Sequence, residues 1–169
     1  MEFTAPYISP LGAITLASDG ERLTGLWFDR QKHFAMMLDA EHEPRPDLQV
    51  LTDTRRWLDI YFSGKEPDFT PPFRLKVTPF RATVCRMLLN IPYGETTTYG
   101  ALAQRFAQEN GLPHFSAQAV AGAVAHNPIS LIIPGHRVVG SDGSLTGYAA
   151  GLDIKEQLLQ LEADGIQRI

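Results

Sequence analysis

The sequence has little of what would place it in several common classes of protein. It contains one cysteine, Cys85, so no disulfide can form within the chain and a zinc site built on cysteines is not expected. No apolar run approaches the roughly 20 residues that cross a bilayer. The opening residues, MEFTAPYISPLG, lack the basic and apolar segments of a secretory signal. We therefore expect a cytoplasmic protein that uses no metal, no cofactor and no membrane.

An excess of positive charge is also missing. The net charge of −4 argues against binding nucleic acid over the whole surface. The charges are unevenly distributed, however: residues 1–70 hold 7 Lys and Arg against 12 Asp and Glu, whereas residues 71–169 hold 8 against 7. Two differently solvated surfaces would explain this difference in charge. Alternatively, the second part of the chain, which has no excess of acidic residues, could face a polyanion.

The first part of the chain reads as a β-meander followed by a helix. Three β-rich runs are separated by turn signals, and the sequence DLQVLTDTRRWLDIYFSG carries apolar residues at helical spacing, with Asp47 as its expected cap. The Pro-interrupted stretch EHEPRPD predicts a loop, and KEPDFTPPF predicts a linker. The three runs are FTAPYI, GAITLAS and RLTGLWF.

The second part is helical. A helix is predicted from Thr78, with Pro79 at its first position, and TTTYGALAQRFAQENG and SAQAVAGAVAHNP predict a helix-turn-helix. ISLIIPGHRVV resembles a strand, SLTGYAAG would return as a small wing, and DIKEQLLQLE predicts a final helix. We expect an α+β protein with an N-terminal domain over residues 1–70 and a C-terminal winged helix-turn-helix domain over 71–169.

A possible acid–base pair lies in the second part. His136 suits proton transfer near neutral pH, and Glu156 could orient it, although Asp153 and Glu156 also resemble a capping box for the final helix. Asn127, before a proline, is either a turn residue or a hydrogen-bonding brace. Cys85 lies inside an apolar helix, which predicts a buried and inert thiol.

Two further features allow two readings each. Residues 116–125 are nearly all Ser, Ala or Gly, which suits either tight helix packing or close approach to nucleic acid. Tyr99 follows three threonines at a helix start, where hydroxyls serve as caps or hold a phosphate.

Taken together, these stretches resemble the O6-alkylguanine-DNA alkyltransferases, the methylated-DNA–protein-cysteine methyltransferases. The resemblance covers about residues 79–162 well and the first part more loosely. It is carried by several long motifs in order: IPYGETTTYGALA, AVAGAVAHNPISLIIP, HRVVGSDGSLTGYAAGL and KEQLLQLE.

The resemblance implies roles for individual residues. The family motif Pro-Cys-His-Arg, whose Cys takes the alkyl group from a flipped guanine, reads Pro134-Gly135-His136-Arg137 here. His136 would be the base that activates the thiol, Glu156 would orient it, Asn127 would brace the site and Arg137 would be structural. The helix from Ser116 would enter the minor groove of double-stranded DNA. Residues expected at the DNA are Thr98, Tyr99, Gln118, Ala119, Ala121 and Gly122, and those at the pocket are Pro134, Tyr148, Ala149 and Ala150.

Several positions depart from the family pattern. Gln118 stands where relatives often have an arginine finger, and Ala121, Ala125 and Ala150 stand where glycine or other small residues are common. Gly135 provides no thiolate, so the chain should not perform the family reaction. Either Gly135 is a laboratory substitution, or the chain is an alkyltransferase-like protein that binds O6-alkylguanine and marks it for nucleotide-excision-repair proteins. A winged helix-turn-helix transcription regulator without a lesion pocket is the alternative.

Overall fold

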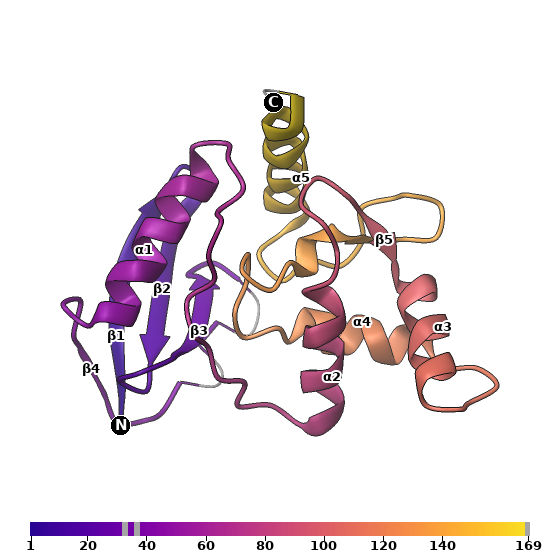
Figure 1. Cartoon of the computed structure of the whole chain (residues 1–169), viewed down its shortest axis with the longest axis horizontal. Helices are drawn as coiled ribbons and strands as arrows, with labels where there is room; N and C mark the ends of the chain where they lie inside the picture. The colour runs from indigo at the N-terminus through magenta and orange to yellow at the C-terminus, as the bar shows by residue number, and fades with distance from the viewer. Residues whose placement is uncertain (32–33, 36–37, 168–169) are drawn as a thin grey trace.

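The computed structural model describes residues 1–31, 34–35 and 38–167. The first part is a sheet in the order β3-β2-β1-β4, covered by a helix (Figure 1). The antiparallel meander of β1 (Glu2–Ser9), β2 (Gly12–Ser18) and β3 (Leu23–Phe28) is as predicted. The expected loop at EHEPRPD is wrong in part, because β4 (His42–Pro44) pairs in parallel with the free edge of β1.

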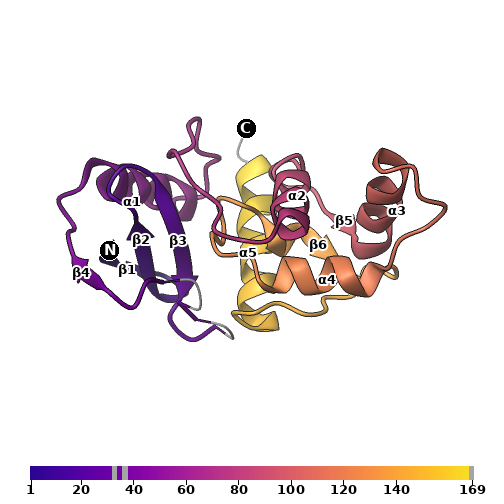
Figure 2. The same ribbon diagram turned by 90° about the horizontal axis from the view of Figure 1, so that it is seen from below.

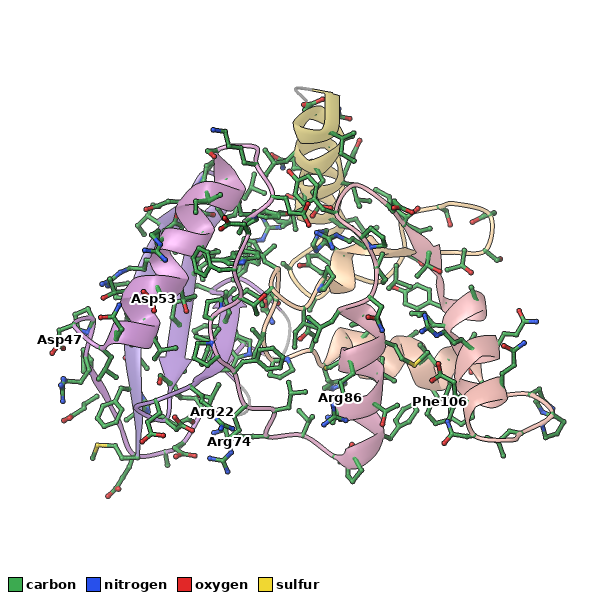
Figure 3. All side chains as sticks on the ribbon, viewed as in Figure 1. Arg22, Asp47, Asp53, Arg74, Arg86 and Phe106 are labelled. Atoms are coloured by element: carbon green, nitrogen blue, oxygen red, sulfur yellow. The ribbon has the colours of Figure 1, made fainter. Side chains whose placement is uncertain are left out.

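Helix α1 (Gln49–Phe62) packs against this sheet through the predicted apolar stripe, in which Leu51, Leu58 and Tyr61 are buried. The predicted cap is wrong. The N-cap position belongs to Leu48, and no side chain caps the helix. The carboxylate of Asp47 instead accepts a hydrogen bond from Arg45 at 3.1 Å, at the outer edge of the molecule (Figure 3).

The second part holds α2 (Pro79–Leu88), α3 (Tyr99–Glu109), α4 (Ala117–Ala125) and α5 (Leu152–Gln167). Side-chain oxygens of Thr78, Thr98 and Ser116 cap α2, α3 and α4 by accepting backbone hydrogen bonds. Helices α3 and α4 pack together as the predicted helix-turn-helix, and α3 lies at the end of the molecule farthest from the sheet (Figure 2).

The segment between α4 and α5 is less regular than predicted. Of the expected strand at 129–139, only β6 (Val138–Val139) forms, in parallel with β5 (Thr97–Thr98). Leu131 has φ of 73°, which breaks an extended chain, and Gly135–Arg137 form one turn of 3₁₀ helix. The wing takes the form of a loop over residues 140–151 rather than a strand.

The two parts join directly. The amide of Leu26 in β3 donates to the carbonyl of Pro128 at 2.9 Å, and the amide of Ser130 donates back to Leu26 at 3.0 Å. Residues 128–130 thus cover an edge of the sheet that would otherwise be open. Within the described ranges, no helix has the length and apolar character needed to span a bilayer.

Candidate functional site

His136 is fully buried and has a carboxylate partner, but the partner is Glu162 in α5. The distance from Nε2 of His136 to Oε2 of Glu162 is 2.5 Å. The predicted pairing with Glu156 is wrong, because Glu156 lies on the exposed face of the same helix. The expectation that a carboxylate holds His136 is met by a different residue, one and a half turns further along α5.

Glu162 is the centre of a buried hydrogen-bond network. Arg137 donates to both of its oxygens, from Nε at 2.8 Å and from Nη2 at 3.2 Å. The hydroxyl of Tyr61 donates to Oε2 at 2.7 Å, and the amide of Gly94 donates to Oε1 at 3.0 Å. Burial alone would raise the pKa of Glu162, but the hydrogen bonds and charges of His136 and Arg137 outweigh it and lower the pKa to about 2.

The sequence contained a signal for Glu162, which the assignment of Glu156 overlooked. Lys155, Leu158 and Glu162 follow the spacing i, i+3, i+7, which places them on one face of α5, and all three are buried. Glu156 points to the opposite side. Tyr61, by contrast, carried no signal, because it reaches the network from α1, far away in the sequence.

The network fixes the protonation of His136. Because Glu162 is ionised and lies at Nε2, that nitrogen carries the proton and Nδ1 keeps its lone pair. Burial lowers the pKa of His136 and outweighs the opposing effect of Glu162. Among the described residues Nδ1 has no hydrogen-bond partner. His136 is therefore a neutral base with one free nitrogen.

Asn127 braces the turn beside this base, as the resemblance implied. Its Nδ2 donates to the carbonyl of Ile133 at 2.7 Å, and its Oδ1 accepts from the amide of Ile129 at 3.0 Å. Both bonds are buried, and together they hold the chain that leads into Gly135. A Cβ atom at Gly135 would lie 3.5 Å from Nδ2 of Asn127 and 3.3 Å from Cγ1 of Val124.

A cavity of about 350 Å³ lies along α4, the helix that also carries Val124. Its walls come from α3, from the small-residue face of α4 and from the loop before α5. Its lining residue Ala125 directly follows Val124, which contacts the Gly135 position. The lining residues are Tyr99, Ala117, Gln118, Ala121, Ala125, Thr146 and Gly147.

The other predicted site residues are not among those that line this cavity. Thr98 caps α3, Ala119 is half-buried, and Gly122 is exposed on α4. Tyr148 packs edge-on to His136 with ring centroids 6.4 Å apart, while Ala149 is half-buried and Ala150 is buried. Pro134 lines a different cavity, which it shares with Tyr61 and Arg137 on the other side of the turn. The placement of Pro134, Tyr148, Ala149 and Ala150 at a lesion pocket stays a prediction, because none of the four lines the cavity along α4.

Lys155 was missed in the sequence and holds the pocket wall. Its ammonium group is buried and donates to the carbonyls of Val138 and Thr146, the latter at 2.9 Å. Burial lowers its pKa to about 8. The hydroxyl of Tyr99 donates to the carbonyls of Thr146 at 3.1 Å and Gly147 at 3.3 Å. Lys155 and Tyr99 thus fix the same stretch of loop over the cavity.

Cys85 is confirmed as a buried residue of the core. Its side chain is 1% exposed, and burial raises the pKa of its thiol to about 11. A thiol of this kind is almost entirely protonated near neutral pH and has no access to solvent. The chain therefore holds a buried neutral base directly after Gly135, and its one thiol is inert and lies in the core.

Both parts of the chain match sequence families. Residues 79–164 match the family described as "6-O-methylguanine DNA methyltransferase, DNA binding domain", and residues 4–75 match "6-O-methylguanine DNA methyltransferase, ribonuclease-like domain". The methylated-DNA–protein-cysteine methyltransferase of Mycobacterium tuberculosis is 40% identical over 159 residues, which cover 91% of this chain and 88% of the relative. That of Methanosarcina acetivorans is 39% identical over 160 residues, covering 95% and 97%.

Solved structures show the same similarity. The O6-methylguanine methyltransferase of M. tuberculosis superposes with a TM-score of 0.82 at 37% identity, over 97% of this chain and 94% of that one. A structure of the M. tuberculosis protein in complex with DNA also gives 0.82, over 97% and 93% at 37% identity. An O6-methylguanine DNA methyltransferase from Methanococcus jannaschii gives 0.63 at 29% identity, over 94% and 93%.

Proposed function

Because this chain belongs to the 6-O-methylguanine DNA methyltransferase family of DNA-repair proteins, we propose that it recognises O6-alkylguanine in duplex DNA without accepting the alkyl group. Helix α4 enters the minor groove, and the damaged base turns out of the stack into the cavity beside Gly135. Because a bound lesion is not repaired by this chain alone, excision-repair proteins would act on the marked site.

One observation carries this proposal: the base is in place although its nucleophile is absent. His136 is held by Glu162 and Asn127 braces the adjacent turn, yet position 135 is glycine. Alkyl transfer to the chain requires a thiolate at this turn, and Cys85 is buried elsewhere. The relatives are named for transfer to a protein cysteine. Without that cysteine, this chain would still bind the lesion but would not accept its alkyl group.

The small residues of α4 support the groove-binding step. Gln118 and Gly122 are exposed, and Ala121 forms part of the cavity wall. A helix face without bulky side chains can approach the floor of a narrow groove. Turning a base out costs a few kcal/mol and is cheapest for a damaged or poorly paired one, which by itself favours the lesion.

Affinity measurements test the proposal through Tyr99. The protein should bind a duplex with O6-methylguanine more tightly than the same duplex with guanine, at one stated salt concentration. Tyr99→Ala removes an aromatic wall and the bonds to the loop, so lesion affinity should fall about 10-fold to 100-fold, the equivalent of about 1–3 kcal/mol. Affinity for intact DNA should change little.

The exposed control Glu156→Ala should bind like the parent. Equal affinity for both duplexes would leave a plain DNA-binding protein, such as the winged helix-turn-helix regulator.

Gln118 gives a second test, since its side chain is exposed at the cavity mouth. If it fills the gap left by the extruded base, Gln118→Ala should reduce the ratio of lesion to intact affinity. Gln118→Arg should keep or strengthen binding and steepen the salt dependence by about one unit for one added phosphate contact. A salt titration of both variants measures this. Loss of binding in the arginine variant would mean that α4 does not face the groove.

A further inference from the structure

Tyr61 is a residue of the first part that reaches the buried base of the second part. It lies in the last turn of α1, and its side chain is fully buried. Its hydroxyl donates to Oε2 of Glu162 at 2.7 Å, and the same oxygen accepts from Nε2 of His136 at 2.5 Å. The hydroxyl oxygen is itself 3.4 Å from Nε2. Two side chains from different parts of the chain therefore share one carboxylate oxygen.

The position of this hydroxyl is set by the packing of α1. The ring of Tyr61 stacks on Trp57, with centroids 5.3 Å apart and an angle of 8° between the planes. It meets Phe62 edge-on at 5.3 Å and His136 edge-on at 6.4 Å. Burial raises the pKa of Tyr61 well above its usual range, so the hydroxyl keeps the proton that it donates. A phenylalanine in its place would keep these ring contacts and lose only the hydroxyl.

The other charged and titratable groups that face His136 come from the second part. Burial lowers the pKa of His136, the carboxylate of α5 raises it, and two neighbouring cations lower it. The ring therefore stays neutral, and Nδ1 has no hydrogen-bond partner among the described residues. The groups of the second part are Glu162 and Lys155 of α5, Arg137 next to His136 in the chain, and Tyr148 of the loop before α5.

We propose that Tyr61 is a positioning residue for His136, through which the first part of the chain completes the site. A hydrogen bond to a carboxylate stabilises its charged form and so weakens its attraction for other protons. By donating to Oε2 of Glu162, the hydroxyl lets the carboxylate hold Nε2 without drawing a second proton onto the ring. Without the hydroxyl, His136 would take up that proton more easily and lose its free nitrogen. The importance of Tyr61 for lesion binding rests on the proposed function.

The test compares the full chain with Tyr61→Phe by NMR, after labelling the histidines with ¹⁵N. A His136→Gln variant assigns the His136 signals among those of the five histidines. The parent should show a neutral ring with its proton on Nε2. In Tyr61→Phe the Nε2 proton should move downfield, because its bond to Glu162 strengthens. The pKa of His136 should rise by about one unit, the effect of one hydrogen bond to a charged partner.

Tyr7→Phe is the matched control. The hydroxyl of Tyr7 also donates to a carboxylate at 2.7 Å, that of Asp59 in α1, and its ring also lies on Phe62. This variant removes a bond of the same kind from the same helix without touching His136. Its His136 signals and the pKa of His136 should match those of the parent. An equal change in both variants, or no change in a folded Tyr61→Phe, would overturn the proposal.

Lesion affinity, measured with the same variants, separates this inference from the proposed function. In Tyr61→Phe the ratio of lesion to intact affinity should fall as the pH is lowered through the raised pKa of His136. The added positive charge attracts both duplexes alike, and the free nitrogen is lost. A ratio that stays at the parent value at every pH would overturn the link between Tyr61 and recognition. If the parent itself does not prefer the lesion, the proposed function fails, whereas the expected change at His136 in the free protein is unaffected.

Discussion

Gly135→Cys should become methylated on residue 135, with one methyl group per protein, when mixed with O6-methylguanine duplex, whereas the unmodified chain should gain none. The new Cβ fits with a small adjustment at Val124, and the new thiol would directly precede His136, whose Nδ1 has no hydrogen-bond partner among the described residues. A neighbouring base makes such a thiol far more reactive than a free cysteine. Intact-protein and peptide mass spectrometry measure the added methyl and its position.

Gly135→Ser is the matched control, since it adds a side chain of similar size without a thiol. Gly135→Cys with His136→Ala should gain little. Methylation of Cys85 in the unmodified chain would contradict its assignment as an inert core residue. If Gly135→Cys folds and binds lesion DNA but takes up no methyl, the pocket has diverged at further positions, and Ala121, Ala125 and Ala150 are the first to exchange.

Glu162→Ala should destabilise the protein by about 3–5 kcal/mol, because it leaves the buried guanidinium of Arg137 without its carboxylate. It also removes an acceptor from Tyr61 and from His136. The matched control is Glu156→Ala in the same helix, which should change the free energy of unfolding by no more than about 0.5 kcal/mol. Urea unfolding measures both. A large loss for Glu156→Ala and a small one for Glu162→Ala would reverse the assignment made from the structure.

Glu156 and Glu162 show which parts of the site could be predicted from the sequence. The resemblance assigned Glu156 to His136, and the capping-box pattern at Asp153 and Glu156 was the competing interpretation, but the carboxylate at His136 is Glu162. In the structure Asp153 pairs with Arg30 of the first part, at 3.3 Å. Glu162 was recognisable only as a polar residue on a buried helical face. Local signals were more reliable at Thr78 and Thr98, where the cap depends on neighbours in the chain and not on the tertiary fold.

Contacts between residues far apart in the chain could not be predicted from the sequence, for a physical reason. Tyr61 joins the His136 network because α1 and α5 meet in space, and no spacing along the chain encodes that meeting. The apolar run before Gly135 fits a strand or a buried irregular segment equally well, and Leu131 with its positive φ decides for the second. Three residues expected at the DNA, Tyr99, Gln118 and Ala121, line the cavity, because they lie on α3 and α4, which are continuous stretches of the sequence.

The most direct test of the account asks where the alkyl group lies in the complex with DNA. A duplex with a ¹³C-labelled methyl on O6-methylguanine is bound to the protein, and nuclear Overhauser effects from that methyl are recorded. The account predicts contacts with the side chains of Ala125, which lines the cavity, and of Val124, which faces the Gly135 position. If the methyl shows contacts only with neighbouring bases, the damaged base has stayed in the stack, and recognition in this pocket is contradicted.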